Sequence, residues 1–214
     1  TLYLTIPSII PAILAKTEEE FTDMVKRIAL YTDLVHLDIA DGEFVPNKTI
    51  SGYRELEKID TKLNFEVHLM VRNPENQISQ WLKTKAIRYL IHWESTTEID
   101  MVINEFGVNG KEIGLVFNPQ TDWSVIEPYI DRVDLIQFMT VDPGFYGSPF
   151  LPEVLEKIRS FHTKYPNKKI QVDGGIHSST IQLVAKAGAS FAVLGSHIFS
   201  EGRDIGEMLR ELNV

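Results

Sequence analysis

Residues 34–47 read LVHLDIADGEFVPN, and the run VHLD within them has the pattern of a buried strand that carries two polar side chains. His36 and Asp38 are two residues apart, so both point to one face of a strand while Leu37 points to the other. A polar pair on a buried face costs free energy unless other groups satisfy it. The pair therefore indicates either a satisfied His–Asp pair in the core or a place where chemistry occurs.

Several other short apolar runs share this strand-like character and are distributed along the chain. The predicted strands cover residues 9–14, 34–38, 64–69, 89–92, 113–117, 135–139, 170–172 and 191–194. Between them lie segments with helical spacing, at 18–31, from 73 onward, and at 152–165, 179–187 and 205–212. Thr17 is the predicted N-cap of the first helix, and Gly188 is the predicted C-cap of the fourth.

This alternation predicts the fold class. Eight strands alternating with helices in a chain of 214 residues are typical of an α/β protein built as a (β/α)8 TIM barrel. A doubly wound open sheet is the alternative, but no glycine fingerprint follows the first predicted strand. No linker rich in glycine, serine or proline divides the sequence, so we expect residues 1–214 to form a single barrel domain.

Composition and charge limit the possible partners. The formal net charge of −9 and the pI of about 5.2 argue against nucleic acid or an anionic membrane surface as the main partner. No apolar run is long enough to span a bilayer, and residues 1–14 lack the basic start of a signal peptide. The chain has no cysteine, which excludes disulfide and thiolate chemistry and fits a cytoplasmic location.

In a barrel, the carboxyl ends of all strands converge on one face, where the functional site lies. Those ends carry the candidate residues, which are Ala12, His36, Asp38, His68, Met70, His92, Asn118, Met139, Asp142, Asp173, Gly195 and Ser196. His68 and Asp173, each at the end of its own strand, join His36 and Asp38 as possible ligands of one divalent metal ion. Because imidazoles favour borderline metals, this set suits zinc, manganese, iron or cobalt better than magnesium or calcium.

Three glycine-rich turns follow predicted strands late in the chain. They are VDPGFYGSPF at 141–150, DGG at 173–175 and GS at 195–196. Glycines allow backbone N–H groups to approach an anion closely, and barrels commonly bind phosphate after the seventh and eighth strands. Each turn alone is ordinary, but three on one face predict a site for a phosphorylated substrate.

Three other residues near these strand ends leave alternatives open. His92 ends the fourth predicted strand and could either support another residue or contact substrate. Asp41, in the loop after the second strand, either stabilises that loop or orients His68 or another ligand. His177 follows the DGG turn and is expected to be structural or on the surface.

Taken together, these motifs resemble the ribulose-phosphate 3-epimerase family. The resemblance covers nearly the whole chain, through VHLDIADGEFVPN, VHLMVRNPE, VFNPQT, MTVDPGFYGSPFLPEVLEKI, QVDGGI and AGASFAVLGSHIF in this order. It implies a metal-dependent barrel isomerase of the pentose phosphate pathway, which interconverts D-ribulose 5-phosphate and D-xylulose 5-phosphate.

The resemblance also implies roles for particular residues. It makes His36, Asp38, His68 and Asp173 the ligands of one divalent ion, with zinc the first choice and iron, manganese or cobalt the others. Asp38 and Asp173 become the two acid–base groups that move a proton at carbon 3 through an enediolate. The residues expected to contact substrate are Met70, Met139, Gly144, Phe145, Tyr146, Gly147, Ser148, Gly174, Gly175, Gly195 and Ser196. The resemblance further implies a homo-oligomer.

Several positions depart from the family pattern and keep two alternatives open. Ala12 and Ala40 stand where the family has a serine and a methionine, and Tyr146 stands where it has a glycine beside the phosphate. The smaller side chains would make room for a longer sugar, so one alternative is a hexulose-phosphate 3-epimerase acting on allulose 6-phosphate. The other is a phosphosugar-binding protein without activity, although the retained ligand set argues against it.

Overall fold

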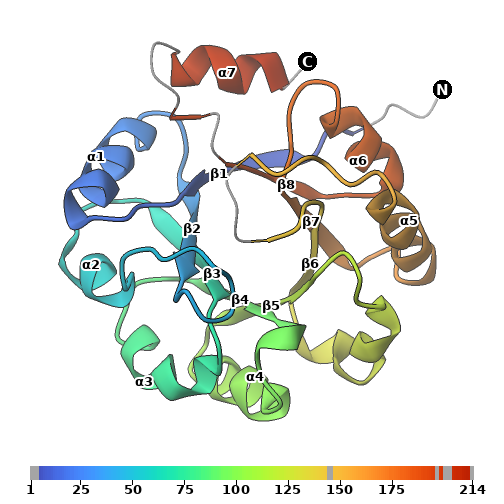
Figure 1. The fold of residues 1–214 in the computed structure, drawn as a ribbon, viewed down its shortest axis with the longest axis horizontal. Coiled ribbons are helices and arrows are strands. Elements are labelled where there is room, and N and C mark those ends of the chain that lie inside the picture. Colours follow the sequence, from blue (N-terminus) through green and yellow to red (C-terminus); the bar gives the residue numbers. More distant parts are fainter. Residues whose placement is uncertain (1–4, 144–146, 196–197, 200–203, 213–214) are drawn as a thin grey trace.

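Eight parallel strands form a closed barrel in the computed structural model, which describes residues 5–143, 147–195, 198–199 and 204–212 (Figure 1). The strands are β1 (Ser8–Ile13), β2 (Leu34–Ala40), β3 (Asn64–Met70), β4 (Arg88–His92), β5 (Glu112–Phe117), β6 (Leu135–Met139), β7 (Lys169–Asp173) and β8 (Phe191–Leu194). Each strand pairs in parallel with the next, and β1 pairs with β8 to close the ring. The predicted (β/α)8 barrel is confirmed, and the open doubly wound sheet is excluded because the ring has no edge strand.

Helices surround the barrel on its outside (Figure 1). The α-helices are α1 (Glu18–Ile28), α2 (Tyr53–Lys58), α3 (Ile78–Trp81), α4 (Ile99–Val108), α5 (Val154–Lys164), α6 (Ile181–Ala187) and α7 (Ile205–Leu212). The 3₁₀ helices are η1 (Pro74–Gln77), η2 (Trp93–Ser95) and η3 (Trp123–Arg132). Thr17 caps α1 as predicted, because its hydroxyl accepts a hydrogen bond from the Glu20 amide, and Gly188 ends α6 with a φ of 107°. The helix predicted from residue 73 onward is divided into η1 and α3, and α2, α4 and η3 have no counterpart among the predicted helices.

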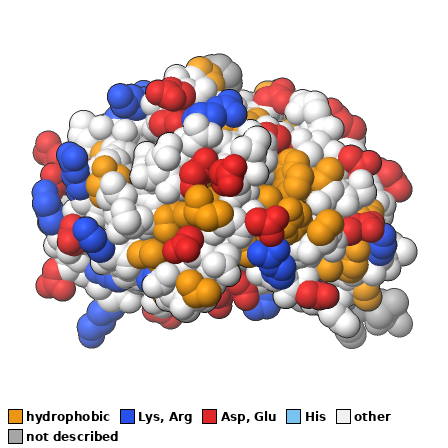
Figure 2. Space-filling view, turned by 90° about the horizontal axis from the view of Figure 1, so that it is seen from below, with side chains coloured by type: hydrophobic (Ala, Val, Ile, Leu, Met, Phe, Trp, Pro, Cys, Tyr) orange, Lys and Arg blue, Asp and Glu red, His pale blue; other side chains and the backbone are white. Residues whose placement is uncertain are grey.

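The side of the barrel that carries α3 and α4 is covered by intermingled acidic, basic and apolar side chains (Figure 2). The net charge of −9 is therefore not concentrated in one patch on that side. Among the described residues, the helices are all too short or too polar to cross a membrane.

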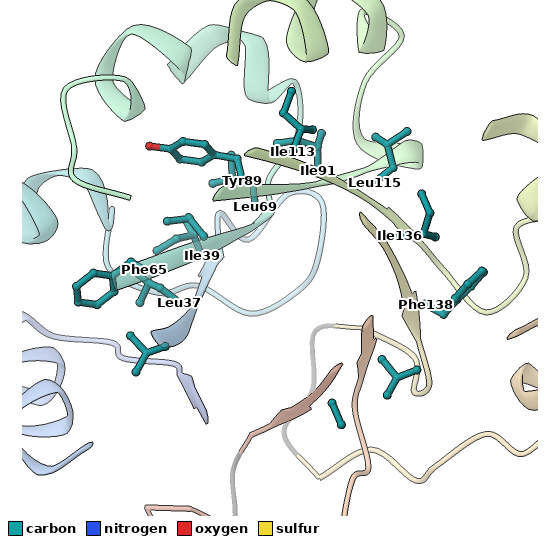
Figure 3. Packing of buried hydrophobic residues seen from close by; sticks show 14 of the residues in the cluster. Leu37, Ile39, Phe65, Leu69, Tyr89, Ile91, Ile113, Leu115, Ile136 and Phe138 are labelled. Atoms are coloured by element: carbon teal, nitrogen blue, oxygen red, sulfur yellow. The ribbon is translucent and has the colours of Figure 1, made fainter. Parts of the chain in front are cut away.

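The largest hydrophobic core lies between the strands and the helices. Alternate residues of each strand point into it, and Figure 3 shows side chains such as Phe65, Tyr89 and Phe138 standing out from the strands toward the helices. Leu37 belongs to this core and is fully buried, as the alternation within VHLD predicts. Because these residues face the helices, the residues that alternate with them along each strand line the inside of the barrel.

The inner face of the barrel is divided into an apolar part and a polar part. Leu90, Val116, Leu135, Met139 and Val141 form a second buried apolar cluster. The polar part consists of buried side chains from β2, β3, β4, β6 and β7, which are His36, Glu66, His68, Arg88, His92, Gln137 and Gln171. A barrel interior is usually filled by branched apolar residues, so this concentration of buried polar groups indicates a functional site.

Gly114 on β5 tests how tightly the inner apolar cluster is packed. A Cβ atom on Gly114 would lie 2.5 Å from Cδ2 of Leu90 and 2.8 Å from Cδ1 of Leu135. We expect Gly114→Ala to lower the free energy of unfolding by about 1–3 kcal/mol, because both leucines are fully buried and would have to shift to make room for the methyl group. The matched control is Gly107→Ala in α4, where a Cβ atom would meet nothing within 4 Å. Alanine there should raise stability by roughly 0.5–1 kcal/mol, and equal effects of the two variants in urea denaturation would contradict the tight interior.

Candidate metal and active site

Two imidazoles and two carboxylates converge at the carboxyl ends of β2, β3 and β7. His36 and Asp38 come from β2, His68 comes from β3, and Asp173 is the last residue of β7. The strand register places Asp38 beside His68, and closure of the ring brings β7 to the same end of the barrel. One donor atom from each of these residues lies within 4.8 Å of the others. The fold therefore brings together the cluster that the sequence analysis identified.

The spacing of these donor atoms fits one bound cation. Asp38 Oδ1 lies 3.2 Å from His36 Nε2 and 2.9 Å from His68 Nδ1. Asp173 Oδ2 lies 3.7 Å from His36 Nε2 and 3.4 Å from His68 Nδ1. Donor atoms that each lie about 2.0–2.2 Å from a tetrahedral ion are roughly 3.4 Å from one another. These four residues could therefore hold a divalent metal ion with little movement.

Burial and charge also favour a cation at this point. The His36 and His68 side chains are fully buried, whereas those of Asp38 and Asp173 are 13% exposed. Burial alone would raise the pKa of Asp38, but the two imidazoles outweigh it and hold that pKa well below its usual range. Burial alone would lower the pKa of His36, yet Asp38 and Glu66 raise it above its usual value. The carboxylates thus attract positive charge to the place where the donor atoms meet.

A layer of buried polar side chains supports this cluster, and none of its members is among the predicted site residues. Glu66 Oε1 lies 2.7 Å from His36 Nδ1, and Gln137 donates a hydrogen bond to Asp173 Oδ2 at 3.2 Å. Gln171 lies between them and donates to both Glu66 and Gln137. The signal that could have found two of them is the same alternation that pairs His36 with Asp38, because Glu66 and Gln171 each stand two residues before a candidate ligand.

His92 contacts His68 and is not among the residues that line the cavity described below. Its Nε2 lies 2.9 Å from His68 Nε2, and the two rings stack with their centroids 4.9 Å apart. Burial lowers the pKa of His92 to about 4, so its ring is neutral near pH 7 and can accept a hydrogen bond from His68. Its Nδ1 lies 3.5 Å from Oε2 of Glu94. Of the two roles left open for His92, these contacts favour support of another residue.

A cavity of about 300 Å³ opens onto the two carboxylates, Asp38 and Asp173. Every described residue for which substrate contact is predicted lines this cavity, and these residues are Met70, Met139, Gly147, Ser148, Gly174, Gly175 and Gly195. The other predicted contacts lie outside the described residues and are Gly144, Phe145, Tyr146 and Ser196. The carboxylate pair and the glycine turns therefore face one common space.

Several strand-end candidates do not reach this cavity. After β1, the residue that lines the cavity is Leu14 and not the candidate Ala12. Asp41 accepts hydrogen bonds from amides of its own loop and from the Arg72 amide, so its contacts stabilise the loop. His177 is exposed, as expected, and it also lines the cavity beside the DGG turn. The strand-end candidates that are not among the described lining residues are Ala12, His36, His68, His92, Asn118 and Asp142.

Fold and site together define a class of protein, a (β/α)8 barrel whose strand ends present two histidines and two aspartates that could hold a divalent ion beside a cavity. The profile of the ribulose-phosphate 3 epimerase family matches residues 5–199. The chain belongs to this family, and the protein is accordingly an epimerase, an enzyme of the isomerase class.

Individual relatives and solved structures agree with this assignment. A ribulose-phosphate 3-epimerase, cytoplasmic isoform, from Oryza sativa subsp. japonica is 37% identical, over 96% of this chain and 91% of that protein. A ribulose-phosphate 3-epimerase from Escherichia coli (strain K12) is 34% identical, over 98% of this chain and 96% of that protein. The crystal structure of a 3-hexulose-6-phosphate synthase superposes with a TM-score of 0.71 at 16% identity, covering 96% of this chain and 98% of that one, which shows the shared fold alone. The family resemblance of the motifs is confirmed.

Proposed function

We propose that this protein is a metal-dependent ribulose-phosphate 3-epimerase that interconverts D-ribulose 5-phosphate and D-xylulose 5-phosphate. The observation that carries the proposal is the pair Asp38 and Asp173, which face one cavity and lie within 3.7 Å of the same nitrogen, His36 Nε2. Family membership supports the substrate, because the two relatives described above are ribulose-phosphate 3-epimerases by name.

Two carboxylates from different strands suit inversion at a single carbon. β8 and β1 separate β7 from β2 in the ring, so Asp173 and Asp38 approach the cavity from different strands that are not neighbours. In the proposed reaction, one carboxylate removes the proton on carbon 3 and the other returns a proton to the opposite face. Each aspartate is the base in one direction and the acid in the other, and the sugar is neither oxidised nor reduced.

The same four residues would hold a divalent metal ion, with His36 and His68 as nitrogen ligands and Asp38 and Asp173 as oxygen ligands. Imidazole ligands suit zinc first, and also iron, manganese or cobalt. A bound ion would stabilise the negative charge of the enediolate that forms when the proton at carbon 3 leaves. Carboxylates are weak bases, so the proton transfer by the two aspartates depends on this stabilisation.

The glycine turns support a phosphate site in the same cavity. Gly174 and Gly175 have φ angles of 111° and 65°, which favour glycine, and a Cβ atom on Gly174 would lie 2.3 Å from Cγ2 of Val141. Backbone N–H groups in such turns bind phosphate at the carboxyl face of barrels. We assign the sugar to the side of the cavity with Met70 and Met139. The phosphate is assigned to Gly144, Phe145, Tyr146, Gly147, Ser148, Gly174, Gly175, Gly195 and Ser196.

Ala40 is the observation that keeps a hexulose phosphate as a second candidate substrate. It lines the cavity and packs against Met70, so its small side chain leaves room for a longer sugar. Ala12 also replaces a larger residue of the family pattern, but it is not among the described lining residues. The case for a longer sugar therefore rests on Ala40.

We also propose a cytoplasmic location and a homo-oligomeric state. The name of the rice relative, a cytoplasmic isoform, supports the location, and the family resemblance supports the oligomer. The net charge of −9 is the reason to expect neither nucleic acid nor an anionic membrane among the partners.

Proton exchange at carbon 3 tests the proposed reaction. Zinc-loaded protein incubated with ribulose 5-phosphate in heavy water is expected to produce xylulose 5-phosphate with deuterium at carbon 3, as followed by NMR. Allulose 6-phosphate serves as a parallel substrate, and its faster turnover would move the assignment to the hexulose phosphate. No exchange with either sugar, in protein shown to hold metal, would contradict both assignments and leave a phosphosugar-binding role.

A further inference from the structure

Glu66 is a fully buried carboxylate that the proposed proton transfers do not use. It lies on β3 in one register row between His36 of β2 and Arg88 of β4, and its side chain is 0% exposed. A buried charge is costly unless it is paired and hydrogen-bonded. The partners of this carboxylate therefore indicate what it does.

Three groups contact the Glu66 carboxylate. Its Oε2 accepts a hydrogen bond from Nη1 of Arg88 at 2.7 Å, and its Oε1 accepts one from Nε2 of Gln171 at 2.7 Å. Nδ1 of His36 also lies 2.7 Å from Oε1. A carboxylate paired with an arginine is ionised and can only accept, so the His36 nitrogen at this contact has to carry the hydrogen.

The hydrogen on Nδ1 determines what the other side of the His36 ring can do. A neutral imidazole carries one N–H, so its lone pair is then on Nε2, which faces Asp38 and Asp173. We propose that Glu66 is a positioning residue, which holds His36 in the Nδ1–H tautomer and presents Nε2 to the ion, an inference that rests on the proposed metal site. Carboxylates that orient metal-binding imidazoles in this way strengthen metal affinity.

The same carboxylate is connected to Asp173 through two amides. Nε2 of Gln171 donates to Glu66 and to Oε1 of Gln137, and Nε2 of Gln137 donates to Oδ2 of Asp173 at 3.2 Å. Each amide has one donating end and one accepting end, so the acceptor at Glu66 determines which way both glutamines point. Loss of that acceptor would loosen Asp173 as well as His36.

His68 is held in the opposite orientation and serves as an internal reference. Its Nδ1 lies 2.9 Å from Asp38 Oδ1, whereas its Nε2 lies 2.9 Å from Nε2 of His92. The two imidazoles should therefore bind the ion through different nitrogens, His36 through Nε2 and His68 through Nδ1.

Glu66→Gln tests this role while the volume of the side chain is nearly unchanged. Arg88, Gln171 and His36 all donate to the carboxylate of Glu66 in the wild type. The NH₂ group of a glutamine at this position would therefore face a donor in either orientation of the amide. Zinc affinity, measured by competition with a chromophoric chelator, is expected to fall roughly 10–100-fold. Glu112→Gln is the matched control, because Glu112 accepts from the same Arg88 but is 47% exposed, and its zinc affinity should stay at the wild-type value.

The wild-type protein supplies a second measurement, which does not require any variant to fold. Long-range ¹H–¹⁵N spectra of the zinc-loaded protein should show the hydrogen on Nδ1 of His36 and on Nε2 of His68. The inference is overturned if His36 carries its hydrogen on Nε2, or if folded Glu66→Gln binds zinc as tightly as the wild type. A wild type that binds no zinc and no other divalent ion would overturn the proposed metal site itself, which distinguishes that failure from failure of the Glu66 role alone.

Discussion

Asp173→Asn is expected to reduce turnover of ribulose 5-phosphate by roughly 10²- to 10⁴-fold, the contribution typical of a positioned acid or base. The amide has nearly the shape of the carboxylate but can neither remove nor return the proton at carbon 3. Asp38→Asn should have an effect of similar size, because both residues line the cavity and exchange roles with the direction of the reaction. The measurement is turnover by NMR, with the metal content of each preparation determined in parallel.

Proton exchange separates loss of a base from loss of the ion. A variant that keeps its metal and one aspartate should still exchange the carbon 3 proton of one epimer with heavy water, without converting that epimer. Asp142→Asn is the matched control, because Asp142 accepts a hydrogen bond from Gln120 and is not among the described lining residues, so turnover should be unchanged. Wild-type turnover by metal-loaded Asp173→Asn would contradict the two-carboxylate reaction.

Removal of the metal ion is expected to abolish turnover and to lower the melting temperature. At a metal concentration about 1,000 times the Kd, binding adds about 4 kcal/mol to the free energy of unfolding, which is roughly 8–16 °C for a chain of this size. The measurement is thermal unfolding and carbon 3 exchange, before and after treatment with a chelator. Zinc, cobalt, manganese or iron should restore both, whereas magnesium should not, because imidazole ligands favour the borderline metals.

A ligand variant provides the control for the effect of the chelator. His68→Gln removes one nitrogen donor from the cluster, so its melting temperature should not respond to chelator or to added zinc. Full turnover by wild-type protein from which the metal has been removed would exclude the ion from the reaction. The two aspartates would then need another source of stabilisation for the enediolate.

The strands are the part of the fold that the sequence predicts best. β6 and β8 coincide with the predicted ranges 135–139 and 191–194, because a short apolar run bounded by turn residues is a local signal. Helices are less predictable where their signal is weak. α2 spans only Tyr53–Lys58, and Leu56 is its one buried residue. A helix this short does not show a helical period of apolar residues in the sequence. η3 contains Pro128 within its span, which interrupts the helical pattern.

The candidate ligands His36, Asp38, His68 and Asp173 could be read from the sequence because each lies at, or within two residues of, the end of a predicted strand, and a barrel gathers its strand ends on one face. For the supporting residues the sequence is less informative, because alternation places Glu66 and Gln171 on the same strand faces as His68 and Asp173 but does not reveal which groups they contact. Glu66 lies 30 positions from His36 and 105 from Gln171, and only closure of the barrel brings these partners into contact. Local sequence thus selects the donor atoms, whereas the tautomers and orientations of those donors depend on hydrogen bonds between strands distant in the chain.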